Sequence, residues 1–142
     1  MATFHPYLNF AGNTEEAFNF YKSVFGGEFI TLMRFKDIPG GGEFPPGTED
    51  KLMYISLAIG GGTVLRATDA IESMGQHLIP GNNSYIYIKA ETKDEATSLY
   101  SLLSAGGKIE MELTDQFWGD YYGAFADKFG TNWMISYENP KA

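Results

Sequence analysis

Residues 13–27 read NTEEAFNFYKSVFGG, and residues 92–107 read TKDEATSLYSLLSAGG. Each segment opens with polar residues that favour a helix start, continues with apolar residues at helical spacing, and ends in two glycines. The dipeptide Glu16-Ala17 matches Glu95-Ala96, and Phe20-Tyr21 matches Leu99-Tyr100, both at an offset of 79 residues. Because order, helix start and helix stop agree, the segments indicate an internal repeat, which restricts the fold more than any single motif does.

The same order of elements surrounds both predicted helices. Alternating β-prone residues predict strands around the first helix at 3–10, 28–37, 52–60 and 63–69. Around the second helix they predict strands at 85–90, 108–114, 121–127 and 132–138. Each half therefore reads β-α-β-β-β, which predicts a single α+β domain over residues 1–142. Its first module covers 1–69, its linker 70–83 and its second module 84–139.

Composition excludes several classes of function. Eighteen acidic against ten basic side chains leave a formal charge of −8, which argues against binding to nucleic acid or to anionic membranes. No stretch approaches the ~20 apolar residues of a membrane span, so we expect a cytoplasmic protein. The chain has no cysteine, which excludes thiol catalysis and thiolate-bound metals. Any metal would need histidine, carboxylate or tyrosine ligands.

One irregular stretch interrupts the first module. Residues 37–50 hold three consecutive glycines and three prolines, and so form a long loop between two predicted strands. Loops of this length in small domains are often lids or binding loops, and the simpler alternative is a mobile surface loop. Both interpretations stay open from the sequence.

Short motifs occur along nearly the whole chain. They are PYLNF at 6–10, GN at 12–13, EA at 16–17, FY at 20–21, FGGE at 25–28, FWGD at 117–120, YG at 122–123, Asp127, FG at 129–130 and Trp133. Together they resemble the vicinal oxygen chelate superfamily of glyoxalase I, bleomycin-resistance proteins and extradiol dioxygenases, and most closely its PhnB-like branch. Lys128 departs from that branch, which usually has proline there. The resemblance implies two modules whose curved mixed sheet forms a cup, helices outside it, and a homodimer.

Alternation along the strands indicates which side chains would line this cup, because successive residues point to opposite faces. With the first strand aligned to the superfamily's metal-bearing strand, the cup is lined by His5, Tyr7, Asn9, Val64, Arg66, Thr68, Tyr85, Tyr87, Lys89, Met134, Ser136 and Glu138. The alternating apolar residues, Leu65, Ala67, Ile86, Ile88, Trp133, Ile135 and Tyr137, would face the helices. A cup with this many polar groups favours a ligand pocket over a filled core.

Metal-dependent members of the superfamily bind a divalent cation through four cup positions. Here the resemblance places these positions at His5, Arg66, Tyr85 and Met134. Only the histidine is a usual ligand, and a guanidinium would repel the cation, so we expect no cofactor and no conventional metal site. An alignment shifted by two residues would bring in Glu138. A metal-dependent lyase, isomerase or dioxygenase therefore stays as the alternative.

The remaining side chains predict a PhnB-like protein that binds a small polar or anionic molecule. Arg66 would hold an anionic group through its planar fork of donors, with His5 and Tyr85 hydrogen-bonding beside it. The other candidate ligand-binding residues are Tyr7, Tyr87, Met134 and Trp118. Whether the chain catalyses a reaction is left open.

Each of these roles has a plainer alternative. Arg66 would brace the sheet by pairing with Glu138 or another acid, and His5 would be a structural hydrogen-bonding residue instead of a base. The aromatic turn around Trp118 would form a rim, a subunit contact or only a tight turn. A dimer module with a filled cup is a third class of function.

Overall fold

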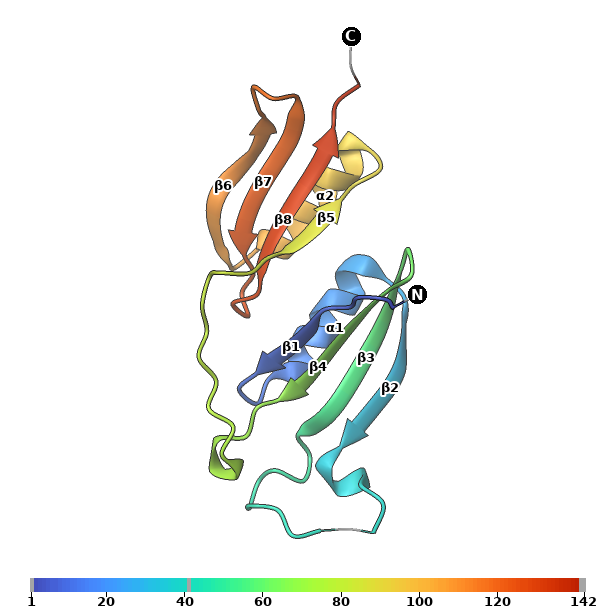
Figure 1. Ribbon diagram of the computed structural model, residues 1–142, viewed down its shortest axis with the longest axis vertical. Coiled ribbons are helices and arrows are strands. Elements are labelled where there is room, and N and C mark those ends of the chain that lie inside the picture. The colour runs from blue at the N-terminus through green and yellow to red at the C-terminus, as the bar shows by residue number, and fades with distance from the viewer. Residues whose placement is uncertain (1, 41, 141–142) are drawn as a thin grey trace. The chain divides into compact units, whose positions relative to one another are not determined.

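Each of the two predicted helices covers one face of a four-stranded sheet formed by its own half of the chain (Figure 1). The computed structural model describes residues 2–40 and 42–140, which divide into unit 1, Met1–Ile79, and unit 2, Pro80–Ala142. The boundary falls inside the segment predicted as the linker. The described residues contain two α-helices and eight strands, and the strands form two mixed sheets. This confirms the predicted α+β class.

Unit 1 has the strand order β1-β4-β3-β2, in which β1 runs parallel to β4 and the other pairs are antiparallel. Its helix α1 packs on β3 and β4. The elements are β1 (Tyr7–Phe10), α1 (Thr14–Phe25), β2 (Glu28–Arg34), β3 (Leu52–Gly60) and β4 (Thr63–Asp69). Short 3-10 helices follow β2 at Phe35–Asp37 and β4 at Glu72–Met74.

Unit 2 repeats this topology with the strand order β5-β8-β7-β6, in which β5 runs parallel to β8. Its elements are β5 (Ile86–Lys89), α2 (Lys93–Ser104), β6 (Lys108–Asp115), β7 (Asp120–Ala126) and β8 (Asn132–Glu138). The Thr92 side chain caps α2 by accepting a hydrogen bond from the amide of Glu95 at 3.0 Å. None of the helices in the described residues is long and apolar enough to cross a membrane.

The core of each unit lies between its helix and its sheet. Ala17, Phe18 and Tyr21 of α1 are fully buried, and the rings of Phe18 and Tyr21 meet edge to face at 5.6 Å. On the strands, Leu65, Ala67, Trp133 and Ile135 are buried, as predicted for the residues that face the helices. Neighbours such as Arg66 and Met134 are more exposed, as a sheet covered on one face requires, whereas Ser136, predicted to line the cup, is buried.

Asp127 is buried in unit 2 and holds the turn that leads into β8. Its Oδ1 accepts hydrogen bonds from the amides of Phe129 at 2.8 Å and Thr131 at 3.1 Å. Its Oδ2 accepts one from the indole N–H of Trp133 at 2.8 Å. The carboxylate therefore ties the turn to the largest buried side chain of the unit.

The paired glycines of the repeat bring the chain close to a neighbouring strand. A Cβ on Gly27 would lie 1.9 Å from the carbonyl oxygen of Ala58, and one on Gly107 would lie 2.1 Å from that of Ala126. Both distances are far shorter than any real carbon contact. The second glycine of each pair is therefore required by the approach of the backbone to the third strand of its own unit.

Two predicted strands are shorter than expected by three residues or more at one end. The strand predicted at 3–10 begins at Tyr7, because Pro6 has no N–H and the amide of Val64 donates to the side chain of His5 at 3.1 Å. The strand predicted at 28–37 ends at Arg34, because the carboxylate of Asp37 accepts the Arg34 amide at 3.0 Å and turns the chain into a 3-10 helix.

Part of the loop predicted at 37–50 is packed against the rest of unit 1. The ring of Phe44 meets that of Phe35 at 5.4 Å, and Thr48 is buried and donates through its hydroxyl to the carbonyl of Pro45 at 2.6 Å. Gly41, within this predicted loop, lies outside the described residues.

Candidate ligand-binding faces

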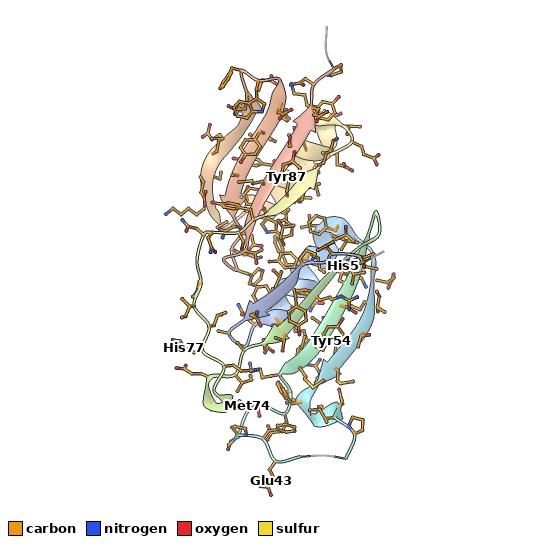
Figure 2. All side chains as sticks on the ribbon, in the orientation of Figure 1. His5, Glu43, Tyr54, Met74, His77 and Tyr87 are labelled. Carbon is orange, nitrogen blue, oxygen red and sulfur yellow. The ribbon has the colours of Figure 1, made fainter. Side chains whose placement is uncertain are left out.

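We call the face of each sheet that is opposite its helix the open face. Arg66 lies at the middle of the open face of unit 1, paired in register with Tyr7 on β1 and with Ser56 on β3. Its Nη1 donates a hydrogen bond to the hydroxyl of Tyr54, and its guanidinium carbon lies 6.0 Å from the centre of the Tyr54 ring. A cation is thus held against an aromatic side chain on this face (Figure 2 labels Tyr54).

The two arginines of the chain differ in their partners. Arg34 forms a bidentate pair with Glu15 at 2.7 and 3.1 Å and also donates to the carbonyl of Asp50 at 2.8 Å. The hydrogen bond from Arg34 lowers the pKa of Glu15. Within the described part of unit 1, no carboxylate forms an ion pair with Arg66. The positive charge of Arg66 is therefore uncompensated inside its own unit.

The acid considered as a partner for Arg66 is occupied elsewhere. The carboxylate of Glu138, on β8 of unit 2, lies 3.9 Å from the ammonium of Lys89 on β5. Both side chains are largely exposed, so this pair contributes little to stability.

Tyr7 adds a second aromatic ring to the open face of unit 1. Its ring lies 6.3 Å from that of Tyr54, with an angle of 20° between the planes, and half of the side chain is exposed. Burial and the neighbouring Tyr54 raise the pKa of Tyr7, while a hydrogen bond with Thr68 opposes this. The phenol therefore stays neutral and presents a ring beside the guanidinium.

His5 lies just before β1, and both of its ring nitrogens have partners inside the protein. Nδ1 accepts a hydrogen bond from the amide of Val64 at 3.1 Å, which requires this nitrogen to be unprotonated. Nε2 lies 3.1 Å from the hydroxyl of Thr3 and carries the proton in this tautomer, assigned from the hydrogen-bond network. His5 thereby continues the pairing of β1 with β4 beyond the end of the strand.

Tyr85 and Glu110 form the open face of unit 2 from opposite edges of its sheet. The hydroxyl of Tyr85 donates to Oε2 of Glu110 at 2.6 Å. Tyr85 immediately precedes β5 and Glu110 belongs to β6, and these strands are the two edges of the sheet, so the hydrogen bond passes over the strands between them. This hydrogen bond is the main cause that raises the pKa of Tyr85.

Tyr122 and Trp118 extend this face toward the turn between β6 and β7. Their rings lie 6.2 Å apart, and the indole N–H of Trp118 donates to Asp120 at 2.8 Å. Burial raises the pKa of Tyr122, and the Glu110 carboxylate and Tyr87 raise it further. Met134 is paired in register with Tyr87 and with Ala124 on the same face. The aromatic turn therefore joins the tyrosines of unit 2 (Figure 2 labels Tyr87).

The described residues contain no group of three or more histidine, cysteine, aspartate or glutamate side chains arranged to hold a metal ion. Of the four positions implied by the resemblance, His5 has both nitrogens engaged, Arg66 carries a positive charge, and Tyr85 donates its hydroxyl to Glu110. The absence of a resident metal nevertheless stays a prediction that metal analysis must test.

Sequence reasoning missed two residues that define these faces. Tyr54 belongs to β3, a correctly predicted strand, and alternation with its neighbours would have placed it beside Arg66. Glu110 was out of reach of such reasoning, because the pairing of β6 with β7 shifts register between Ile109 and Met111. A shift of register breaks the alternation that assigns a side chain to a face.

Comparisons with known proteins agree over the length of this fold. The sequence model of the Glyoxalase/Bleomycin resistance protein/Dioxygenase superfamily matches residues 3–135. Protein YjdN of Escherichia coli strain K12 is 29% identical over 92% of each chain. The crystal structure of protein PA1353 from Pseudomonas aeruginosa is 31% identical, with a TM-score of 0.86 over 99% of this chain and 100% of that one. The PhnB protein from Bacillus cereus is 25% identical, with a TM-score of 0.76 over 96% and 99%.

Proposed function

Because the chain belongs to the Glyoxalase/Bleomycin resistance protein/Dioxygenase superfamily, we propose that it is a PhnB-like binding protein for a small organic anion, held by Arg66. The observation that carries this proposal is the contrast between the two arginines. Arg34 is neutralised by Glu15, whereas Arg66 has a phenol hydroxyl as its partner within unit 1. A cation left without a counter-charge on a sheet face has donors available for a ligand.

The surroundings of Arg66 favour a flat carboxylate. A guanidinium presents parallel N–H donors that match the two oxygens of a carboxylate. The rings of Tyr7 and Tyr54, tilted by only 20° to each other, supply apolar surface for a planar group attached to that carboxylate. Benzoate combines both features and is therefore the first probe.

The test compares the affinity of Arg66→Gln and of the unsubstituted protein for benzoate, measured by isothermal titration calorimetry. We expect saturable binding that weakens by roughly 10- to 100-fold in the variant, since a charge-assisted hydrogen bond contributes about 1.5–3 kcal/mol. Arg34→Gln is the matched control, because it removes the other arginine of the chain. It should lower thermal stability and leave the affinity for benzoate unchanged.

Two results would contradict the proposal. Equal affinity of Arg66→Gln and unsubstituted protein would leave Arg66 as a brace for Tyr54. Stoichiometric divalent metal in the purified protein, lost in His5→Ala, would favour the metal-dependent lyase, isomerase or dioxygenase instead. If Arg66→Gln unfolds, Arg66→Lys keeps the charge but removes the fork, and should weaken benzoate binding without loss of fold.

Two further expectations belong to this proposal. We expect a homodimer, which the resemblance to the superfamily implies, and a cytoplasmic location. Sedimentation equilibrium and cell fractionation test these two expectations, respectively.

A further inference from the structure

The open face of unit 2 places the carboxylate of Glu110 near four aromatic side chains, one of which, Trp118, donates its indole N–H to Asp120. Glu110 accepts the hydroxyl of Tyr85 at 2.6 Å, and Tyr122 lies beside Trp118 at 6.2 Å between ring centres. About half of the Tyr87 and Trp118 side chains is exposed, at 56% and 51%. Aromatic surface is therefore accessible next to a negative charge.

No cation of the described part of unit 2 neutralises Glu110. Lys89 pairs with Glu138. Lys93, the first residue of α2, pairs with Asp115, and its ammonium also lies 4.5 Å from the ring centre of Tyr121. Among the described protein atoms, the partner of the Glu110 carboxylate is the neutral hydroxyl of Tyr85. Its charge is thus available to a ligand.

The electrostatics of this face favour a cation. The hydrogen bond to Glu110 raises the pKa of Tyr85, and the same carboxylate adds to the effect of burial in raising the pKa of Tyr122. The part of each shift that comes from Glu110 reflects the negative charge of this carboxylate near both phenol oxygens, and such a charge stabilises a nearby cation. The faces of tyrosine and tryptophan rings carry partial negative charge and therefore also attract ammonium groups.

We propose that the open face of unit 2 binds a small, free organic ammonium ion, with Glu110 as its counter-charge and Tyr87, Tyr122 and Trp118 as its aromatic walls. This site involves neither Arg66 nor any other residue of unit 1. It is therefore a second binding function, and its test is separate from that of the anion site.

Choline chloride, titrated into the full-length protein, is the probe, and the two indole N–H signals in NMR spectra are the readout. Trp118 should shift saturably, whereas Trp133, whose indole is buried against Asp127, should not move and so reports an intact fold. Glu110→Gln should weaken binding at least about tenfold, because it removes the counter-charge. Glu112→Gln, which removes a charge from the same strand near Tyr100, is the matched control and should leave binding unchanged.

The neutral isostere 3,3-dimethylbutan-1-ol separates attraction of a cation from simple apolar contact, and we expect it to leave Trp118 unshifted. The proposal is overturned if choline gives no saturable shift, if the neutral isostere binds as well, or if Glu110→Gln and Glu112→Gln bind choline equally. Sedimentation of the protein with phosphatidylcholine vesicles would overturn the assignment to a free molecule, and we expect none. Benzoate binding through Arg66 gives an independent result in every case.

Discussion

Asp69 connects three elements of unit 1 through one buried carboxylate. Its Oδ1 accepts hydrogen bonds from the amide and the hydroxyl of Thr14 at 3.0 and 2.6 Å, and its Oδ2 accepts the amide of Leu52 at 2.8 Å. The side chain is only 2% exposed. The end of β4 thereby caps the start of α1, where an anion is favourable because the N-terminus of a helix is positive. The same carboxylate fixes the start of β3 through the amide of Leu52.

We expect Asp69→Ala to lower the free energy of unfolding by about 2–4 kcal/mol, since it leaves three buried donors without an acceptor. Urea denaturation measures this loss. Asp50→Asn is the control, because Asp50 is exposed and pairs with Lys36 at the surface. A loss no larger than that of the control would show that water replaces the carboxylate at no cost.

At the scale of elements, the second glycine after each helix lies against the backbone of another strand in both units. Gly26 and Gly27 both have positive φ, at 75° and 86°, but only the second of them approaches another strand. A Cβ on Gly26 would meet no atom within 4 Å, whereas one on Gly27 would collide with the carbonyl of Ala58. Both positions therefore favour glycine because of their positive φ, but only at Gly27 would a side chain also collide with a neighbouring strand.

This difference predicts the outcome of two neighbouring substitutions. Gly26→Ala should cost about 1–2 kcal/mol, the usual penalty for an alanine at positive φ. Gly27→Ala should cost at least about 3 kcal/mol, because α1 or β3 must also move. Denaturant midpoints of the two variants measure both costs, and equal midpoints would contradict the role of Ala58.

For the whole molecule, surface carboxylates with basic or amide partners govern the response to acid. Hydrogen bonds from Arg34, Lys36 and Asn139 are the main causes that lower the pKa of Glu15, Asp50 and Asp115, respectively. A lowered pKa in the folded state stabilises the fold above the group's usual value, 4.5 for Glu15 and 3.8 for the aspartates. That stability is lost as the pH falls through the lowered folded value.

We therefore expect stability to change little from pH 7 to the isoelectric point of about 4.6, where repulsion from the net charge of −8 decreases. Below pH 4.5 it should fall, as thermal melting across the acid range would record. Glu15→Gln should cost about 0.5–1 kcal/mol at pH 7, because the pair with Arg34 is partly exposed, and should flatten the acid decline. An unchanged decline in this variant would contradict the assignment to Glu15.

The sequence by itself determined the α+β class, the repeat and most element bounds. Its evidence was local: helical spacing in residues 13–27 and 92–107, alternation in β3, β4 and β8, and paired glycines where helices end. Local periodicity reports secondary structure because the side chains of one element repeat at the period of that element. The alternation also separated residues that face the helix from residues of the open face, as Leu65 and Arg66 show.

Only the tertiary structure decided which side chains meet on the open faces and which groups are already satisfied. Tyr54 reaches Arg66 from the next strand, and Glu110 reaches Tyr85 past two strands and a shift of register. Asp69, at the end of β4, caps the start of α1. These partners are distant in sequence, and their pairing depends on strand order and register. No period within one segment encodes such contacts, because they exist only once the sheet has formed.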